Sequence, residues 1–423
     1  MCLTFEKNWI LYMIKFEGFT LENGLQVVVH EDPNSLIAAV NLMYYVGARD
    51  EEPHKTGFAH LFEHLMFSGS QNIPSYDEPL QQVGGTNNAY TSSDVTSYHC
   101  TLPVANLETA FWLESDRMLG LSFNKKGLEV QRKVVIEEFK EVYLNQPYGD
   151  AWGQLTGLTY TQHPYQWPVI GKEISHIEQA SMEDVKAFFS KFYVPNNAVL
   201  VVAGGVTLEQ VKQLSKKWFE PIAAGKVPDK KFSQEPIQKT TRTKTVEQHV
   251  PLDAIYKAYH APGRLEKGYY ATEVLCTALG IGKSSTLYQE LIETRECFNT
   301  IGSYTTETID PGLLVISGRV NEEITLKEAE QNLCDVIHTI QTNGFTEAEL
   351  EKAKNHLEAS FVYDTVDITN RAEELAYATL LGDTNMVNTN VDNILNVTLE
   401  ELRQMATRLL QSENSSTLYY KRK

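Results

Sequence analysis

Two histidines and a glutamate in the first quarter of the chain have the types and the spacing that metal chemistry requires. His60, Glu63 and His64 lie at positions i, i+3 and i+4 of the otherwise apolar stretch 57–67, GFAHLFEHLMF. In a helix these three side chains share one face. Two imidazoles one turn apart can bind a metal ion, and the carboxylate beside them can act as a general base. The alternative is that both histidines are core residues satisfied by hydrogen bonds.

A third ligand can come from the stretch 128–143, LEVQRKVVIEEFKEVY, which has helical periodicity. Glu138 lies in an apolar row at a spacing of four, with Val130, Val134 and Val142. A carboxylate on an apolar stripe is costly unless it is paired or coordinates a cation. We therefore prefer Glu138 as the ligand, although Glu137 and Glu141 remain alternatives. A glutamate that reaches solvent from the edge of the helix also remains possible.

This combination of H-x-x-E-H with a downstream glutamate resembles the inverzincin zinc metallopeptidases, the family of pitrilysin, insulin-degrading enzyme and mitochondrial processing peptidase. The resemblance runs from about residue 16 onward, and the chain is most similar to the short bacterial processing-peptidase-like members. It implies an α+β fold of two homologous α/β-layer domains with antiparallel-rich sheets. Further matching segments are 84–91, 96–98, 163–165, 168–171 and 193–198.

The resemblance implies a Zn2+ ion held by His60, His64 and Glu138, with Glu63 as the catalytic residue. Three protein ligands leave one coordination position for water, and zinc lowers the pKa of that water to about 7. Glu63, which is not needed as a ligand, can take up the proton and pass it to the leaving amine. The implied activity is peptide-bond hydrolysis by a zinc metalloendopeptidase.

The same resemblance implies an edge strand that binds the substrate backbone as an added β-strand, a mode that selects extended peptides. Its residues are Asn88, Ala89, Tyr90 and Thr91. Without the resemblance, an ordinary edge strand explains this stretch equally well. Gln131 is implied to lie behind the ligands and to orient them, although family members often have glutamate at that position.

One part of the family pattern is missing from this chain. Inverzincins complete their site with an arginine and a tyrosine, seven residues apart, from the second half or from a partner subunit. In the matching segment 285–299 those positions fall on Ile292 and Asn299, and the nearby Arg295 and Tyr304 are out of register. The transition-state oxyanion would then lack its donors within this chain. We therefore expect a homologous partner subunit that lacks the zinc motif to supply them; a homodimer is the alternative assembly.

Length and composition restrict the class of protein. A chain of 423 residues is too long for one ordinary core and is expected to form two domains. An apolar fraction of 42% and a charged fraction of 22% are typical of a globular protein. The net charge of −18 argues against nucleic acid as a partner. The five cysteines include no C-x-x-C pair, which favours reduced thiols in the cytoplasm.

We expect three segments: a catalytic zinc domain over 1–220, a polar linker with the first strand of the second half over 221–250, and a homologous domain without the metal motif over 251–423. Residues 1–12 are expected to be a loosely ordered extension without signal-peptide features, and no stretch is apolar enough for a membrane span. Strands are expected near 38–45, 88–102, 198–204, 254–259, 313–320 and 417–420. Further helices are expected near 76–83, 104–119, 181–192, 268–279, 284–294, 326–342, 346–363, 368–381 and 398–410.

The sequence thus predicts a zinc-dependent endopeptidase or oligopeptidase that hydrolyses extended peptides, as the metal-bearing subunit of a two-subunit enzyme. The main alternative is a non-catalytic scaffold or assembly subunit of the same family, which would not need an open metal site. A metal-dependent hydrolase of a non-peptide substrate is a third class, but it would not need a strand that pairs with a peptide backbone.

Overall fold

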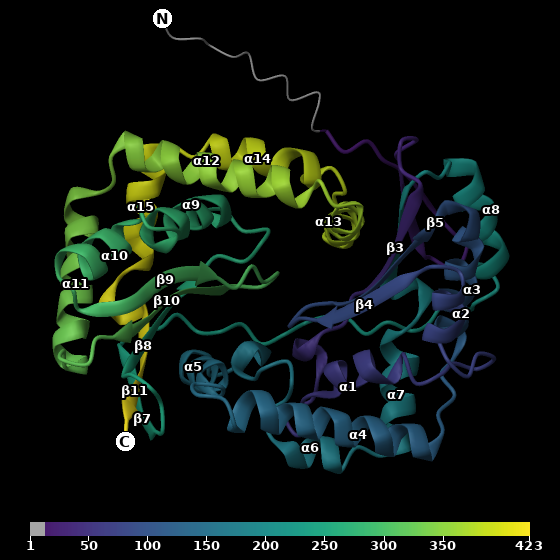
Figure 1. Ribbon diagram of the computed structural model, residues 1–423, viewed down its shortest axis with the longest axis horizontal. Helices are drawn as coiled ribbons and strands as arrows, with labels where there is room; N and C mark the ends of the chain where they lie inside the picture. Colours follow the sequence, from purple (N-terminus) through teal and green to yellow (C-terminus); the bar gives the residue numbers. More distant parts are fainter. Residues whose placement is uncertain (1–12) are drawn as a thin grey trace, which may run out of the picture.

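Two β-sheets organise the chain, one in each half (Figure 1). The computed structural model describes residues 13–423, so the extension expected over residues 1–12 lies outside the described residues. Helices pack on both faces of each sheet. The chain therefore has the layered α+β architecture that the sequence predicts.

The first sheet has six strands in the order β1-β2-β6-β3-β5-β4. β2 and β6 are parallel, and the other neighbouring pairs are antiparallel. β6 reads AVLVVAG and is buried along its whole length, as expected for a central strand between two helical layers. The strands are β1 (Glu17–Thr20), β2 (Gln26–Glu31), β3 (Ile37–Tyr44), β4 (Thr86–Thr91), β5 (Thr96–Pro103) and β6 (Ala198–Gly204).

The second sheet repeats this pairing with five strands in the order β7-β11-β8-β10-β9. Its first and last strands along the chain, β7 and β11, are parallel, and the other pairs are antiparallel. The strands are β7 (Arg242–Gln248), β8 (Ala254–Ala261), β9 (Phe298–Thr305), β10 (Gly312–Val320) and β11 (Ser415–Arg422). The match of β7–β11 to β2–β6 agrees with two related halves.

Fifteen α-helices are assigned within residues 13–423. Those of the first half are α1 (Phe58–Leu65), α2 (Asp77–Gln82), α3 (Leu107–Leu119), α4 (Lys125–Phe139), α5 (Ala151–Thr159), α6 (Ile174–Glu178), α7 (Met182–Phe192) and α8 (Leu208–Trp218). Those of the second half are α9 (Tyr269–Gly280), α10 (Thr286–Tyr288), α11 (Leu326–Asn343), α12 (Glu347–Asp364), α13 (Ile368–Leu380), α14 (Met386–Leu395) and α15 (Leu399–Leu409).

Each half contributes one helix to the sheet of the other half. Leu375 of α13 belongs to the apolar cluster of Met43 on β3 and contacts the first sheet. In the opposite direction, Leu155 of α5 belongs to the cluster of Val315 and Leu418 on the second sheet. These crossed contacts bury apolar surface between the halves and hold them together. The domain boundaries expected at 220 and 250 stay a prediction.

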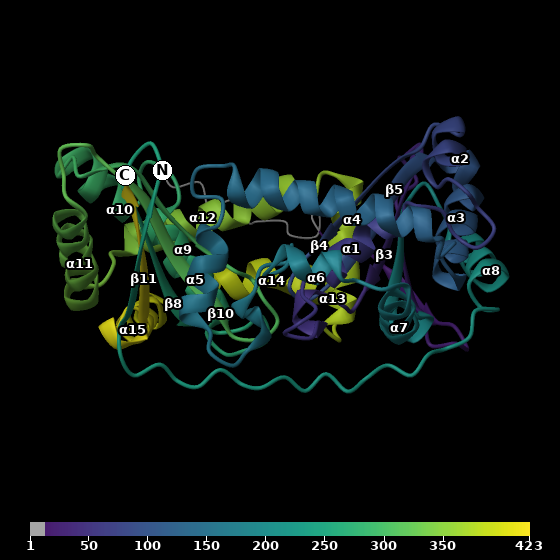
Figure 2. The ribbon, with the colours of Figure 1, turned by 90° about the horizontal axis from the view of Figure 1, so that it is seen from below.

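An extended segment, 223–239, leads from α8 to β7 along one side of the molecule (Figure 2). Lys230 anchors its middle, because its Nζ donates to Asp50 Oδ2 at 2.9 Å and to the backbone carbonyl of Tyr45. The segment lies inside the stretch where we expected a polar linker, and β7 follows it as the first strand of the second sheet.

The structure differs from the expected elements in three places. The one strand expected over 88–102 is a hairpin of β4 and β5, because the polar turn 92–95 reverses the chain. The helix expected over 284–294 is the short α10 followed by a π-helical turn, Gln289–Thr294. Finally, β9, α5, α6, α8 and α14 were not expected; β9, FNTIGSYT, lacks a clear apolar alternation.

Candidate metal centre

The helix α1 presents three polar side chains on one side because its apolar residues pack inward. Its buried residues are Phe58, Ala59, Leu61, Phe62 and Leu65. His60, Glu63 and His64 are only partly buried. The three side chains therefore lie together at the edge of an apolar core, as the spacing predicts.

The start of α1 is fixed by Glu51, a residue that no pattern in the sequence indicates. Its buried carboxylate accepts the backbone N–H of Gly57 at 2.9 Å and of Ala59 at 2.8 Å. Such groups lack partners within the helix, so an acceptor from outside it satisfies them. Burial nevertheless raises the pKa of Glu51 to about 8. The placement of both histidines thus depends on a contact from the loop before the helix.

We expect Glu51→Ala to lower the free energy of unfolding by about 1–3 kcal/mol, because two buried backbone donors lose their acceptor. Zinc affinity should fall in the same variant, since the helix that holds both histidines is loosened. Chemical denaturation and zinc titration measure the two effects. Glu52→Ala is the matched control, because Glu52 is exposed. Equal unfolding curves for the two variants would contradict this role of Glu51.

The ligand atoms of His60, His64 and Glu138 lie within 4.8 Å of one another, between α1 and α4. The distance from His60 Nε2 to Glu138 Oε1 is 3.6 Å, and from His64 Nε2 to Glu138 Oε2 it is 3.3 Å. Zinc bonds of about 2.0–2.1 Å in a tetrahedron separate neighbouring ligand atoms by about 3.3–3.4 Å. Within residues 13–423, this is the one group of three or more His, Cys, Asp or Glu side chains whose ligand atoms lie close enough to hold a metal ion. The donor set therefore fits zinc.

The protonation states also fit a metal centre. Burial lowers the pKa of His60 to about 4, against the opposing attraction of Glu138, so this imidazole is neutral at pH 7. The hydrogen bond from His64 holds the pKa of Glu138 below its usual range, so the carboxylate is ionised. A neutral imidazole and an ionised carboxylate are the forms that bind a metal.

Glu138 reaches the histidines for a reason other than the expected one. The row that contains it is not a buried stripe: Val130, Val134 and Val142 are 47%, 43% and 40% exposed. The buried residues of α4 are instead Leu128, Val135 and Phe139. Glu138 therefore lies on a partly exposed face of α4 that runs past α1, and the inference from a buried apolar stripe was wrong.

The alternative ligands Glu137 and Glu141 are not part of this group. The Glu137 side chain is 71% exposed and pairs with Lys140 at 2.7 Å. Glu141 is exposed on the π-helical turn Lys140–Leu144 that follows α4. Of the three glutamates considered, only Glu138 faces the histidines.

Glu63 lies on the same face of α1 but outside the ligand group. Thr91, the last residue of β4, donates a hydrogen bond from Oγ1 to Glu63 Oε2 at 2.7 Å. Burial raises the pKa of Glu63, and the Thr91 hydrogen bond partly opposes this shift. One carboxylate oxygen of Glu63 is thus oriented by β4.

We expect Thr91→Val to lower kcat about tenfold while zinc content is unchanged, because one hydrogen bond that orients the Glu63 carboxylate is lost. Thr91→Ser keeps the hydroxyl and should restore most of the rate. Steady-state peptide hydrolysis together with metal analysis measures both quantities. A full rate in Thr91→Val would show that Glu63 does not depend on this contact.

The expected substrate strand is an edge of the first sheet. Among the strands of residues 13–423, β4 pairs only with β5, so its other side carries the unpaired backbone groups of an edge. Asn88 Oδ1 accepts the N–H of Ala89 at 2.9 Å and covers one of them. Tyr90 and Thr91 point to opposite faces because side chains alternate along a strand. The binding of substrate by Asn88, Ala89, Tyr90 and Thr91 stays a prediction.

Two polar groups at the candidate site have no side-chain hydrogen-bond partner among the described residues. Gln131 lies on α4 two turns before Glu138, and among residues 13–423 no side chain forms a hydrogen bond with it. The buried Nδ1 of His60 likewise has no hydrogen-bond partner among the described residues. Metal-bound histidines usually donate this second N–H to an acceptor. The role predicted for Gln131 remains a prediction.

The second half has a counterpart of α1 without the ligands. Both helices follow a glycine with positive φ, Gly57 before α1 and Gly268 before α9, and both lie between corresponding strands of their sheets. Counted from Gly268, the positions of His60, Glu63 and His64 are occupied in α9 by Ala271, Val274 and Leu275. The second half therefore keeps the helix and lacks the metal chemistry.

Neither Arg295 nor Tyr304 takes the place of the missing pair. Arg295 is held within the second half, where it donates to Asn332 and pairs with Glu290 and Asp335. Tyr304 lies on β9 and lines a different cavity. Neither of these two residues thus belongs to the ligand group.

Two family descriptions match successive parts of the chain. Residues 26–171 match "Insulinase (Peptidase family M16)", and residues 179–357 match "Peptidase M16 inactive domain". The first match contains the three candidate ligands and Glu63, and the second contains α9. The chain belongs to peptidase family M16, which confirms the predicted resemblance.

Similar proteins match over nearly their whole length. "Zinc protease PqqE" of Helicobacter pylori is 29% identical, over 97% of this chain and 94% of that protein. "Uncharacterized zinc protease YmxG" of Bacillus subtilis is 26% identical, over 95% and 97%. The crystal structure of a protease from Helicobacter pylori, 28% identical, superimposes with a TM-score of 0.91 over 97% of this chain and all of that chain.

Proposed function

We propose that the chain is a zinc-dependent endopeptidase or oligopeptidase that hydrolyses extended peptides. The observation that carries this proposal is the spacing of the Nε2 atoms of His60 and His64 from the Glu138 carboxylate, which suits a tetrahedral zinc ion. Glu63 lies beside this group and takes no part in it. The names of the near-full-length relatives, which are zinc proteases, support the same class.

Zinc, when bound by His60, His64 and Glu138, would polarise the scissile carbonyl and lower the pKa of the bound water. Glu63 accepts the proton of the attacking water and donates it to the leaving amine. Its burial raises its pKa towards the range in which one carboxyl group can perform both transfers. The free edge of β4, next to Thr91, orients the peptide backbone as an added strand.

The enzyme acts as the metal-bearing member of a pair of subunits. The two positions that the family pattern gives to the arginine and the tyrosine are Ile292 and Asn299 in this chain, and the nearby Arg295 is occupied elsewhere. Beside Glu138, the exposed Val130 and Val134 of α4 and Val142 of the following π-helical turn form an apolar strip that a second subunit could cover. A homologous subunit that carries the arginine and the tyrosine supplies the missing donors.

The purified chain alone should hydrolyse peptides at least about 100-fold more slowly than the chain mixed with a homologous subunit that carries the arginine and tyrosine. Sedimentation analysis of the same samples identifies the pair. A chain that sediments as a monomer and is fully active alone would overturn the two-subunit proposal and leave the peptidase in place.

A non-catalytic scaffold is the second candidate, favoured by the match of residues 179–357 to the inactive domain of the family. The two candidates differ in zinc binding and in peptide cleavage. A scaffold would either bind no zinc, or bind zinc and cleave no peptide with any partner. The peptidase must bind zinc and cleave peptides. The ligand group His60, His64 and Glu138 favours the peptidase.

We also propose a reducing compartment, the cytoplasm. Cys100, Cys276, Cys297 and Cys334 are all free in the structure, as expected where thiols stay reduced. Among residues 13–423, no helix has the length and apolar character needed to cross a membrane. Peptides and a homologous subunit are the proposed partners.

A further inference from the structure

Three consecutive charged residues, Arg49, Asp50 and Glu51, lie in the interior of the molecule just before α1. Arg49 and Glu51 are 2% and 7% exposed, and the side chain of Asp50 is 3% exposed. They occupy the end of the short 3₁₀ helix Ala48–Asp50 and the residue that follows it. Burying three neighbouring charges is costly unless each is paired. Their partners therefore show which segments this turn holds together.

The three side chains reach three different parts of the molecule. Glu51 accepts the first backbone N–H groups of α1, the helix that carries both histidines. Asp50 accepts a hydrogen bond from Lys230 at 2.9 Å, in the extended segment between α8 and β7. Arg49 pairs with Asp310 at 2.8 Å, in the connection between β9 and β10 of the second half. One short turn thus contacts the zinc helix, the extended segment and the second half.

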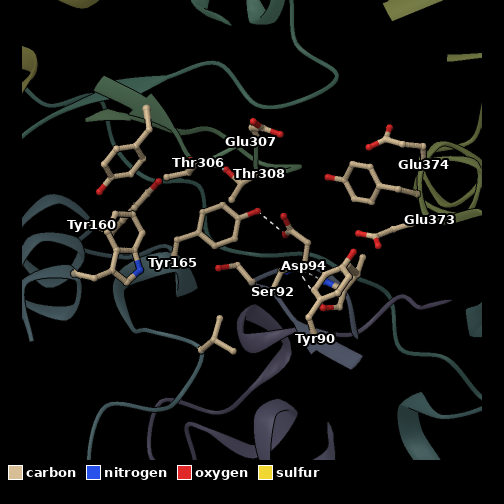
Figure 3. A pocket seen from close by; sticks show the side chains of 16 residues that line it. Tyr90, Ser92, Asp94, Tyr160, Tyr165, Thr306, Glu307, Thr308, Glu373 and Glu374 are labelled. Carbon is tan, nitrogen blue, oxygen red and sulfur yellow. Dashed lines mark hydrogen bonds between the residues drawn. The ribbon is translucent and has the colours of Figure 1, made fainter. Parts of the chain in front are cut away.

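Arg49 fastens the second half to the hairpin of β4 and β5. Its Nη1 lies 2.8 Å from Asp94 Oδ1, in the turn after β4, and 2.8 Å from Asp310 Oδ2. Asp94 Oδ2 accepts the N–H of Ile309 at 2.9 Å. Tyr165 donates its hydroxyl to Asp94 Oδ1 at 2.5 Å, and Figure 3 shows these two side chains facing one another. Charge-assisted hydrogen bonds of this kind are the stronger ones in proteins.

Two short routes lead from Arg49 to the candidate site. Glu51 lies two residues further along the same turn and holds the start of α1. Asp94 lies three residues after Thr91, which donates to Glu63 at 2.7 Å. The first route fixes the helix that carries the histidines, and the second fixes the orientation of the proposed general base.

The turn and the hairpin are packed too closely to move independently. The backbone N–H groups of Ala48 and Arg49 donate to the carbonyls of Ser92 and Ser93 at 3.1 and 3.0 Å. A Cβ atom on Gly47 would lie 2.5 Å from the backbone of Ser93, so the two chains touch at this glycine. Close-packed segments transmit a displacement instead of absorbing it.

Asp310 is the member of this group whose removal disturbs the interior least. Its side chain is 35% exposed, whereas those of Arg49 and Asp94 are 1% and 4% exposed. The hydrogen bond from His163 and the charge of Arg49 hold the pKa of Asp310 below its usual range, so the carboxylate is ionised. Within residues 13–423, Asp310 is the acidic partner that the second half gives to Arg49.

We propose that Asp310, in the half without the metal motif, is a positioning residue for the zinc site of the other half, an inference that rests on the proposed peptidase function. Through Arg49 it holds the turn that fixes both the start of α1 and the end of β4. The second half then contributes to the chemistry although Asp310 is not one of the grouped ligands.

The kinetic test compares Asp310→Ala with the wild type as the full chain, at saturating zinc and with the homologous subunit present. We expect kcat to fall about 10–100-fold, because small displacements of reacting groups are costly. KM should stay near its wild-type value, because peptide binding along β4 does not need the exact position of Glu63. Asp392→Ala removes an exposed carboxylate of the same half and should change neither constant.

Hydrogen exchange of the backbone amides gives a measurement that does not depend on activity. In Asp310→Ala we expect exchange to be about tenfold faster at residues 57–61 and 92–95, because both segments lose part of their support. The helix α8, Leu208–Trp218, should exchange as in the wild type. In a double-mutant cycle with Arg49→Lys, the losses in kcat should not add, because Asp310 acts through Arg49.

The possible outcomes separate this inference from the proposed function. Faster exchange in every segment of Asp310→Ala would show a general loss of stability and overturn the positioning role, as would additive losses in the cycle. Equal cleavage by Asp310→Ala and the wild type would keep the peptidase and overturn the inference. Faster exchange confined to residues 57–61 and 92–95, with no cleavage by the wild type, would support the link from Asp310 to α1 and overturn the proposed function.

Discussion

Glu63→Gln is expected to lower kcat for peptide hydrolysis by about 10²–10⁴-fold. The amide has nearly the shape of the carboxylate and can still accept the hydrogen bond from Thr91, but it cannot take up a proton from water. Zinc binding should stay close to one ion per chain, because Glu63 is not among the three grouped ligands. The variant therefore separates proton transfer from metal binding.

Stopped assays with a quenched fluorescent peptide, run beside metal analysis of the same protein, measure this effect. Glu52→Gln serves as the control, because it removes a carboxylate that is exposed on the loop before α1. Zinc loss together with activity loss in Glu63→Gln would mean that Glu63 helps to hold the metal, and an unchanged kcat would remove its role as the general base.

Glu138→Ala is expected to weaken zinc binding by more than about 100-fold, since losing even a group behind the ligands costs 10–100-fold. Activity should fall in parallel when zinc is limiting. Glu137→Ala is the closest possible control: it removes the adjacent carboxylate, whose side chain is 71% exposed and pairs with Lys140. Its zinc affinity and activity should match those of the wild type.

Zinc titration in competition with a chelating dye measures both affinities. Equal affinity in Glu138→Ala and the wild type would contradict the ligand assignment. A loss in Glu137→Ala as large as that in Glu138→Ala would point instead to a general change in α4.

The local part of the candidate site could be predicted from the sequence because helix geometry fixes it. His60, Glu63 and His64 share a face at their spacing whatever the rest of the chain does. Of the three glutamates considered, Glu138 is the one that lies beside the histidines, but the reason given for preferring it was wrong, since its valine neighbours are exposed. Periodicity reveals a shared face, but it does not reveal whether that face meets the core or a solvent-filled space.

The long-range contacts could not be predicted in this way. Glu51 reaches α1 through the fold of a loop, and Thr91 reaches Glu63 across 28 residues from the end of an edge strand. The same limit applies to the fold. Strongly apolar strands such as β6 were expected, whereas the placement of α13 on the first sheet depends on contacts between distant segments.

The central claim is that zinc at His60, His64 and Glu138 makes this chain a peptidase. The most direct test is hydrolysis of an unfolded protein substrate by the chain together with its homologous subunit, before and after removal of zinc by a chelator. We predict cleavage that is lost on zinc removal, returns with about one zinc ion per chain, and is absent when His64→Ala replaces the wild type. Cleavage that persists without zinc, or in His64→Ala, would contradict the claim, as would a zinc-loaded pair that cleaves nothing.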